Sequence, residues 1–414
     1  MTSRTLLSAL LCAAACAPDD ASDTLEPGIC GDGVLNLDEA CDVPGDPGCD
    51  AACHLTDEIA WTVTRGEPGV FLTYPQDVAV GADGRIYVLG FRWGGGDLPD
   101  EGEGWLLALE PNGKVRWEID VQTPGGGEGV RSSRVAVDAD GSVYHQGVDV
   151  FSYTADGALR WKSAETTDLL PEPGASLRAA TGLAVAGDAV FTASYGYRDL
   201  VADVPPTVDA SVRRHDPATG ALVWETVLSG VTDVAWADAL TVSGDIVVAA
   251  GPSDPEGYGT SAFACTVVGS GDLVPCAPTI AAFVSRMTAL SDGDLVLVGA
   301  DEGGFVRRMD LAGTVAWEIP SNEQFGVTGV AGGPDGTIAL AGNVGEFETV
   351  SAAVRILDGG GATSWTLTID PQGDEETVSA AAVVHGPGFL VVTGSADRFG
   401  AVTTPWVRRI GPAT

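Results

Sequence analysis

Positive charge is scarce in this chain of 414 residues. Lysine and arginine together number 21 against 58 aspartates and glutamates, giving a net charge of -37, and only Lys114 and Lys162 are lysines. A chain this acidic repels phosphate backbones, so we exclude nucleic acid as a partner. There is also no run of 18 apolar residues, so the sequence predicts no membrane-spanning helix.

Familiar catalytic motifs are missing as well. The chain has four histidines, at positions 54, 145, 215 and 385, and none has the HExxH spacing of a zinc hydrolase. It has neither a G-x-S-x-G elbow nor a P-loop. These motifs therefore assign no catalytic residue.

Glycine, in contrast, is abundant, with 56 residues, and 45% of the chain is hydrophobic while 19% is charged. This composition argues against disorder and is typical of a turn-rich β protein.

Residues 1–16 have the pattern of an export signal. Arg4 precedes a short apolar run, and the segment ends in AAAC at 13–16. This ending resembles the lipobox of bacterial lipoproteins, although Ala13 stands where leucine is usual. The resemblance implies that residues 1–15 are removed, that Cys16 is lipidated, and that the protein is anchored in the cell envelope, at the outer membrane or cell surface. An ordinary signal peptide is the alternative. Residues 16–29 are small and acidic and predict a flexible tether.

Six further cysteines remain once Cys12 and Cys16 are set aside, and an even set in an exported chain predicts disulfides. Four of them, Cys30, Cys41, Cys49 and Cys53, lie in a module at 30–56 that has too few apolar residues for its own core. The segment resembles the cysteine-rich repeat of exported myxobacterial proteins, which begins CGDG and continues N-x-x-E-x-CD. Three pairings of its cysteines are open.

Oxygen ligands gather in the same module. They are Asp32, Asn36, Glu39 and Asp42, a donor set that suits Ca²⁺. Their spacing is not that of an EF-hand, and the alternative is that they cap local turns. Ca²⁺ is the one cofactor that the sequence suggests.

Residues 57–414 repeat a pattern of short strands and tight glycine turns. One hairpin recurs seven times, first as DVAVGADGRIYVLG at 77–90 and last as AAAVVHGPGFLVVTGS at 380–395. A second hairpin usually ends in tryptophan four residues after a turn glycine, as in Gly113 and Trp117. Four strands per repeat of about 50 residues are typical of a propeller blade. We therefore predict an all-β, seven-bladed β-propeller closed by the N-terminal strand 57–63, which adds the fourth strand to the last blade, whose third strand is at 405–414.

The fourth repeat lacks the tryptophan and has two cysteines instead. Cys265 and Cys276 flank the turn at 269–272 symmetrically, which predicts that they face each other and form a cross-strand disulfide.

The segment HDPATGALVWE at 215–225 resembles the tryptophan repeat of quinoprotein-like propellers, whose enzymes bind PQQ. None of their catalytic or calcium-binding positions can be placed in this chain. We therefore expect a monomeric binding or scaffolding protein that engages an envelope or extracellular protein or carbohydrate. The expected binding surface is the long-loop face, which carries the connections between blades and between the second and third strands of each blade. The alternative is a propeller enzyme, either a Ca²⁺-dependent hydrolase or lyase or a degenerate quinoprotein oxidoreductase.

Candidate site residues lie where the innermost strands begin. Six of seven aligned positions there are serine or threonine, and the next positions include Asp77, Arg134, Asp233 and Arg286. If these face the channel, the two arginines would hold an anion and the two aspartates would orient the anion. The alternative is that all four serve contacts between blades.

Overall fold

The computed structural model describes the repeat region and leaves the N-terminal segments out. The described residues are 59–64, 72–93, 103–121, 134–147, 149–163, 177–198, 207–228, 237, 239–254, 257–276, 280, 282–300, 304–320, 325–346, 349–371, 377–397 and 403–411. The predicted lipidation site Cys16, the cysteine module and its proposed Ca²⁺ ligands Asp32, Asn36, Glu39 and Asp42 lie outside them. So do the cysteines at 30, 41, 49 and 53.

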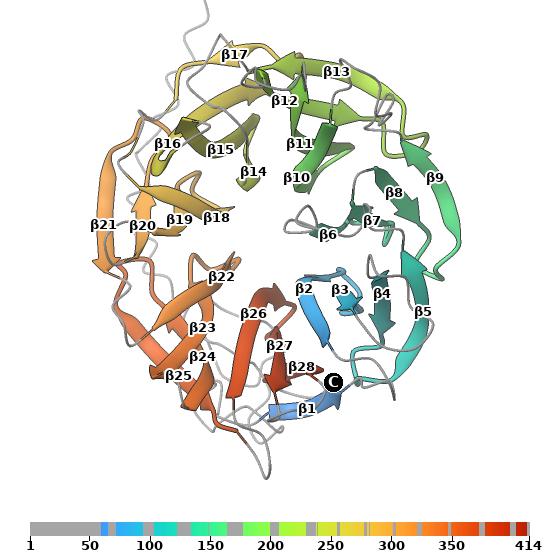
Figure 1. The fold of residues 1–414 in the computed structure, drawn as a ribbon, viewed down its shortest axis with the longest axis vertical. Helices are drawn as coiled ribbons and strands as arrows, with labels where there is room; N and C mark the ends of the chain where they lie inside the picture. Colours follow the sequence, from blue (N-terminus) through green and yellow to red (C-terminus); the bar gives the residue numbers. More distant parts are fainter. Residues whose placement is uncertain are drawn as a thin grey trace, which may run out of the picture.

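The described elements are β-strands, arranged as antiparallel meanders around a common axis (Figure 1). The first blade contains β2 (Leu72–Val80), β3 (Ile86–Trp93), β4 (Glu103–Leu109) and β5 (Val115–Val121). The second contains β6 (Arg134–Val137), β7 (Val143–Gln146), β8 (Val150–Tyr153) and β9 (Leu159–Ser163). The third contains β10 (Leu177–Ala186), β11 (Ala189–Arg198), β12 (Thr207–His215) and β13 (Leu222–Val227).

The fourth blade contains β14 (Ala239–Ser243), β15 (Ile246–Asp254), β16 (Gly257–Val267) and β17 (Leu273–Val274). The fifth contains β18 (Phe283–Ala289), β19 (Leu295–Ala300), β20 (Phe305–Met309) and β21 (Val315–Pro320). The remaining sheet contains β22 (Gly326–Gly332), β23 (Ile338–Glu346), β24 (Thr349–Leu357), β25 (Thr363–Ile369), β26 (Thr377–Gly386), β27 (Phe389–Asp397), β28 (Thr404–Ile410) and β1 (Ile59–Thr64).

The all-β propeller prediction is confirmed, but the prediction of seven separate four-stranded blades was wrong. The described residues form five such blades and one eight-stranded sheet. The cause is local: a single parallel pair, Val350 with Thr377, joins β24 to β26. Two consecutive meanders thereby become one sheet.

The N-terminal strand closes the ring as predicted. β1 pairs antiparallel with β28, Ile59 opposite Ile410 and Thr64 opposite Trp406, and the two strands lie together at the edge of the ring (Figure 1). This pairing covers the outer edge of β28, an edge that would otherwise be open to another chain.

Outer-strand tryptophans join neighbouring blades, which explains their regular spacing. Four of them donate an indole N–H to a backbone carbonyl of the next blade or sheet: Trp117 to Ala155 at 2.9 Å, Trp161 to Pro217 at 2.9 Å, Trp224 to Val268 at 3.1 Å and Trp317 to Gly359 at 3.0 Å. A Cβ on Gly361, at φ +84°, would meet the Trp317 ring at 2.8 Å, so the turn needs glycine both for its conformation and for space. The tryptophan thus packs on the turn of the following repeat, not on its own.

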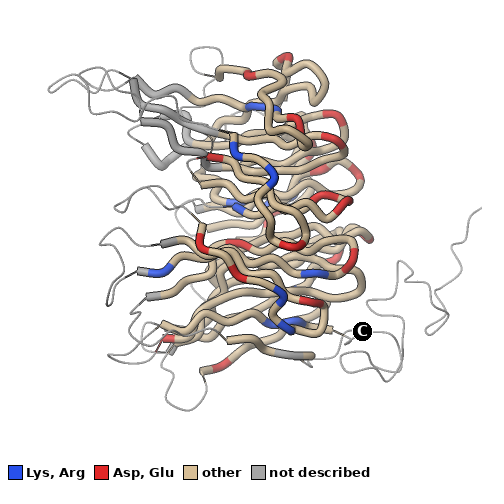
Figure 2. Tube along the Cα trace, turned by 90° about the vertical axis from the view of Figure 1, so that its right-hand side faces the viewer, with Lys and Arg blue, Asp and Glu red and all other residues tan. Residues whose placement is uncertain are grey.

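Acidic side chains gather on one side of the disc. Figure 2 shows most of the described Asp and Glu along one side of the disc, the side formed by the tight turns. Several of these acids cap their own turns. Asp138, for example, accepts hydrogen bonds from the backbone N–H groups of Asp140 and Ser142 at 3.0 and 2.8 Å. Their local role is structural.

Candidate functional site

Five innermost strands carry a β-bulge within their first five residues, at the end of the channel opposite the tight turns. The pairing register shifts by one residue in β2, β10, β18, β22 and β26. The extra residues are Gln76, Thr181, Ser285, Thr328 and Ala381. A bulge re-aims a side chain and often borders a functional site.

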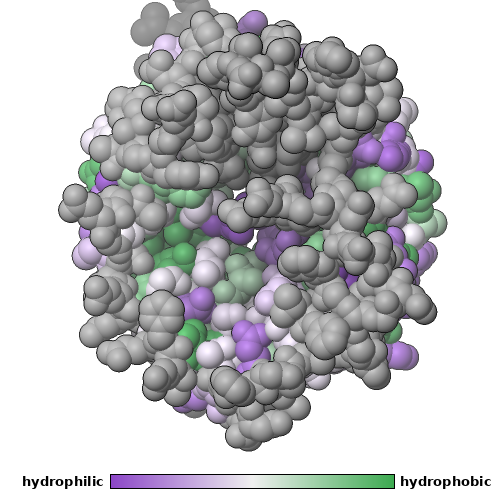
Figure 3. Space-filling model, viewed as in Figure 1, coloured by the Kyte–Doolittle hydropathy of each residue, from purple (hydrophilic) through white to green (hydrophobic). Residues whose placement is uncertain are grey.

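These bulges border a cavity of about 410 Å³ at the centre of the ring, which we call the loop-side mouth. Its walls are Pro75, Gln76, Arg134, Ser285, Arg286, Thr328, Ala380 and Ala381. In Figure 3 this face is hollowed at its centre, and hydrophilic residues border the opening. Four of the eight lining residues are the bulged ones, so the bulges build the cavity.

The structure brings together the two arginines that the sequence singled out. Arg134 begins β6 of the second blade and Arg286 lies in β18 of the fifth, yet both line the loop-side mouth. Arg286 donates from Nη1 to its neighbour's carbonyl, Ser285 O, at 3.1 Å. Two guanidinium groups at one cavity form a positive site in a strongly negative protein.

Asp77 lies behind this pair. Its Oδ2 accepts a hydrogen bond from the backbone N–H of Val135 at 3.0 Å, which joins the first blade to the second. Burial raises the pKa of Asp77 above its ordinary value, while the charges of Arg134 and Arg286 and the bond from Val135 oppose the shift. Both arginines are therefore close enough to act on this carboxylate.

Inter-blade contacts, the alternative raised for these residues, account for part of the Asp77 role. Other junctions also have a side-chain acceptor for a backbone N–H of the next meander, since Val284 N–H donates to Ser261 Oγ and Ala380 N–H to Asn343 Oδ1, both at 2.9 Å. Asp77 thus links the first blade to the second through a hydrogen bond. Arg134 and Arg286 are the charged groups that face the cavity.

The hydroxyl groups of two bulged residues form hydrogen bonds with backbone carbonyls of neighbouring strands. Ser285 Oγ donates to Val298 O at 3.2 Å, and Thr328 Oγ1 contacts Ala341 O at 3.3 Å and Ala380 O at 2.8 Å. Their protons are committed to backbone carbonyls. The charged donors that an anion in the cavity would meet are therefore the two guanidinium groups, beside the neutral amide of Gln76.

The prediction for Asp233 is not tested, because Asp233 lies outside the described residues. Ser379 is the last of the seven aligned positions where the innermost strands begin, and it does not line the cavity. Its Oγ lies 2.9 Å from Ser395 Oγ, and Ala381 is the bulged residue of β26. Reasoning from the sequence missed the bulges, because an extra residue in one strand shows only once the two strands are paired.

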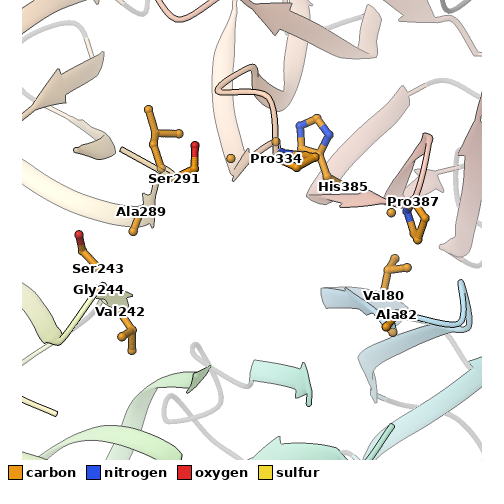
Figure 4. A pocket seen from close by; sticks show the side chains of 15 residues that line it. Val80, Ala82, Val242, Ser243, Gly244, Ala289, Ser291, Pro334, His385 and Pro387 are labelled. Atoms are coloured by element: carbon orange, nitrogen blue, oxygen red, sulfur yellow. The ribbon is translucent and has the colours of Figure 1, made fainter. Parts of the chain in front are cut away.

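The opposite end of the innermost strands surrounds a second cavity, of about 630 Å³, which we call the turn-side mouth. It is lined by the turns that follow β2, β14, β18, β22 and β26, and the sequence analysis did not predict it. Figure 4 shows Val80, Val242 and Ala289 around it, with His385 at the rim beside Pro334. Burial lowers the pKa of His385 to about 4, with the negative charge of Asp335 opposing the shift.

Metal-ligand clusters are not seen in the described part of the chain. No group of three or more His, Cys, Asp or Glu side chains there is arranged to hold an ion. Likewise, no helix in the described ranges is long and apolar enough to cross a membrane.

The predicted cysteine pair lies in the fourth blade, with a register that differs from the prediction. Cys265 is opposite Val274, not Cys276, because the turn is closed one position earlier, by the bond from Val267 N–H to Asp272 O at 3.0 Å. Both residues are thiols in this structure. The disulfide stays a prediction.

Comparison with known proteins gives the fold and no family. No protein-family model matches the chain, and no curated protein matches it. Among solved structures, a protein of unknown function from Dyadobacter fermentans is similar, at 13% identity and TM-score 0.51, over 86% of this chain and 99% of that one. The β-propeller domain of the Trilobed protease from Pyrococcus furiosus is similar at 10% identity and TM-score 0.50, over 83% and 94%. The WD40 propeller domain of Doa1 matches at 16% identity and TM-score 0.48, over 85% and 95%.

Proposed function

We propose that this protein is a binding propeller that holds a carboxylate of its ligand in the loop-side mouth, between Arg134 and Arg286. The observation that carries the proposal is that two arginines from the second and fifth blades line one cavity, in a chain of net charge -37. Guanidinium groups bind carboxylates through paired, charge-assisted hydrogen bonds.

The size and charge of the protein restrict the ligand. A cavity of about 410 Å³ holds a compact acidic group, and the net charge of -37 opposes a polyanion. We therefore propose that the partner, an extracellular or envelope protein or carbohydrate, presents an isolated carboxylate to the channel. Export and the anchor at Cys16 belong to the same proposal, and the sequence pattern at 1–16 supports them.

We also propose that the eight-stranded sheet is equivalent to two blades, which would restore a sevenfold repeat. Each half is a four-stranded antiparallel meander, β22 to β25 and β26 to β28 with β1, and one parallel pair joins the halves. The enzyme alternative has no observation in its favour among the described residues and stays a prediction.

Calorimetric titration with succinate tests the binding proposal, with succinamide as the uncharged probe of the same shape. Wild type should bind succinate and not succinamide. Replacing both Arg134 and Arg286 by Gln should weaken succinate binding at least tenfold, because each charged hydrogen bond is worth about 1.5–3 kcal/mol. The matched control is Arg116→Gln with Arg307→Gln, which removes the same two charges at residues bonded to Glu110 and Glu318 outside the cavity. Equal affinity in the double variant and the control would reject the site.

A further inference from the structure

One junction between neighbouring blades lacks the hydrogen bond from a tryptophan indole to the next turn, which we call the tryptophan clamp. The fourth blade ends in β17, a strand of only two residues, Leu273–Val274, with no indole to donate to the fifth blade. The fifth blade still has the turn that would accept this hydrogen bond, which we call the receiving turn. In it, Leu311 occupies the position of Ala155 and Gly359, whose carbonyls are the acceptors in other turns. The described residues therefore leave this junction without the hydrogen bond found at four others.

The two cysteines lie at this junction. Cys265 is 1% exposed, and both cysteines pack in one hydrophobic cluster with Val284, Leu297 and Leu311 of the fifth blade. The cluster thus contains the receiving turn together with the thiols. The cysteines therefore lie on the side of the fourth blade that packs against the fifth, where a clamping tryptophan would lie.

The thiols are also in contact with each other. A hydrogen bond with Cys276, followed by burial, raises the pKa of the Cys265 thiol well above its ordinary value. Cys276 follows the end of β17, so its backbone is not held by the ladder that pairs Cys265 with Val274. It can therefore approach Cys265 without breaking a strand pair.

We propose that Cys265 and Cys276 are joined by a disulfide in the mature protein, and that this bond replaces the missing tryptophan clamp between the fourth and fifth blades. The bond closes the hairpin after β16 and holds the residues that pack against Leu311. It is independent of the proposed carboxylate site.

The chemistry is thiol–disulfide exchange with a disulfide-bearing oxidant. One cysteine thiolate attacks the oxidant's disulfide, forming a mixed disulfide and expelling one thiolate. The second cysteine then attacks the protein sulfur of that mixed disulfide and expels the other. The two cysteines lose two protons and two electrons in total, and the oxidant becomes two thiols.

Peptide mapping tests the bond directly. The full-length protein, made with its export signal, is alkylated without reduction and cleaved on the N-terminal side of aspartate. Asp272 is the only acidic residue between the two cysteines, so cleavage there separates them unless a disulfide holds the fragments together. We expect the two peptides to stay joined until reductant is added. Recovery of both cysteines in alkylated form, or joined to other cysteines, would reject the bond.

Melting temperature tests the structural role. Reductant should lower the melting temperature of wild type by about 5 °C more than that of the Cys265→Ala/Cys276→Ala variant, whose remaining cysteines report any effect elsewhere. Cys276→Ser alone, at the less buried position, serves if the double variant does not fold. Trp224→Phe, at the preceding junction, should keep the full response to reductant. An equal response in wild type and both cysteine variants would overturn the clamp role.

Discussion

The two mouths of the central channel are built from the same strands but differ in chemistry. At the turn-side mouth the chain must reverse within a few residues, and glycine, serine and proline line the cavity. At the loop-side mouth the bulges leave side-chain identity free, and the residues there are Gln76, Ser285, Thr328 and two arginines. The turn-side mouth is thus dictated by backbone geometry. The loop-side mouth is where different residues can be placed without changing the fold, and a ligand site fits that freedom.

The mouths also differ in the sign of their response to acid. The pKa of His385 is lowered in the folded protein, so the unfolded chain binds a proton more readily as the pH falls from 6.5 towards 4, and stability is lost. The pKa of Asp77 is raised, so its contribution is present at low pH and is lost as the pH rises above 3.8 and through the raised value. Acid therefore weakens one end of the channel and favours the other.

Replacing His385 by Gln should give the largest effect on this contrast. Between pH 7 and pH 4 the wild type should lose up to about 3 kcal/mol more unfolding free energy than the variant, because a half-buried imidazole that is neutral in the fold becomes protonated on unfolding. Urea titrations across this range measure the difference. Asp77→Asn should show the opposite trend, with the advantage of wild type over the variant falling as the pH rises. Parallel pH curves for wild type and His385→Gln would contradict the assignment.

Replacing Asp77 by Ala should cost about 2 kcal/mol at neutral pH. The Val135 N–H would lose its acceptor between two blades, and Arg134 would lose a nearby carboxylate. Asp83→Ala is the matched turn-side control, because Asp83 serves only its own exposed turn: it accepts a hydrogen bond from Arg85 N–H at 3.0 Å and forms an ion pair with the Arg85 guanidinium at 2.9 Å. It should cost less than about 1 kcal/mol. If urea unfolding gives equal losses of unfolding free energy for both variants, the hydrogen bond of Asp77 does not stabilise the contact between the two blades.

Replacing Thr328 by Val should have the smallest effect of the three, about 1 kcal/mol. The change keeps the side-chain shape and removes the hydroxyl that contacts Ala341 O and Ala380 O. Ser291→Ala, in the lining of the turn-side mouth, should change the unfolding free energy by less than 0.5 kcal/mol, roughly the usual limit for surface positions. Thermal unfolding of the two variants side by side resolves this difference, and an unchanged Thr328→Val would show that the hydroxyl does not support the bulge.

Periodicity was enough to predict the parts of the fold that repeat. Trp117, Trp161, Trp224 and Trp317 recur because each meets the same turn of the next repeat, so their spacing reflected a real contact. The strand containing Trp61 was recognised as the missing partner of 405–414 by the same logic. Arg134 and Arg286 were grouped by alignment alone, and the structure brings both to one cavity.

Features that depend on pairing register could not be predicted in this way. The turn between Cys265 and Cys276 is placed one position from its predicted centre, which moves every cross-strand partner. The bulges at Ser285 and Thr328 need both strands to be visible, and the Val350 pair with Thr377 depends on how closely two meanders approach. Each is decided by tertiary contact and not by local preference.

The pairing of β1 with β28 sets the order in which this protein can complete its fold. Ile59 and Ile410 are about 350 residues apart in the chain, so closing the ring is the contact with the largest entropic cost and the last partner to be synthesised. Until then, the first strand of the propeller has no place in a sheet. Assembly therefore ends where the chain began, and a protein truncated anywhere before β28 would leave both edges of the ring open.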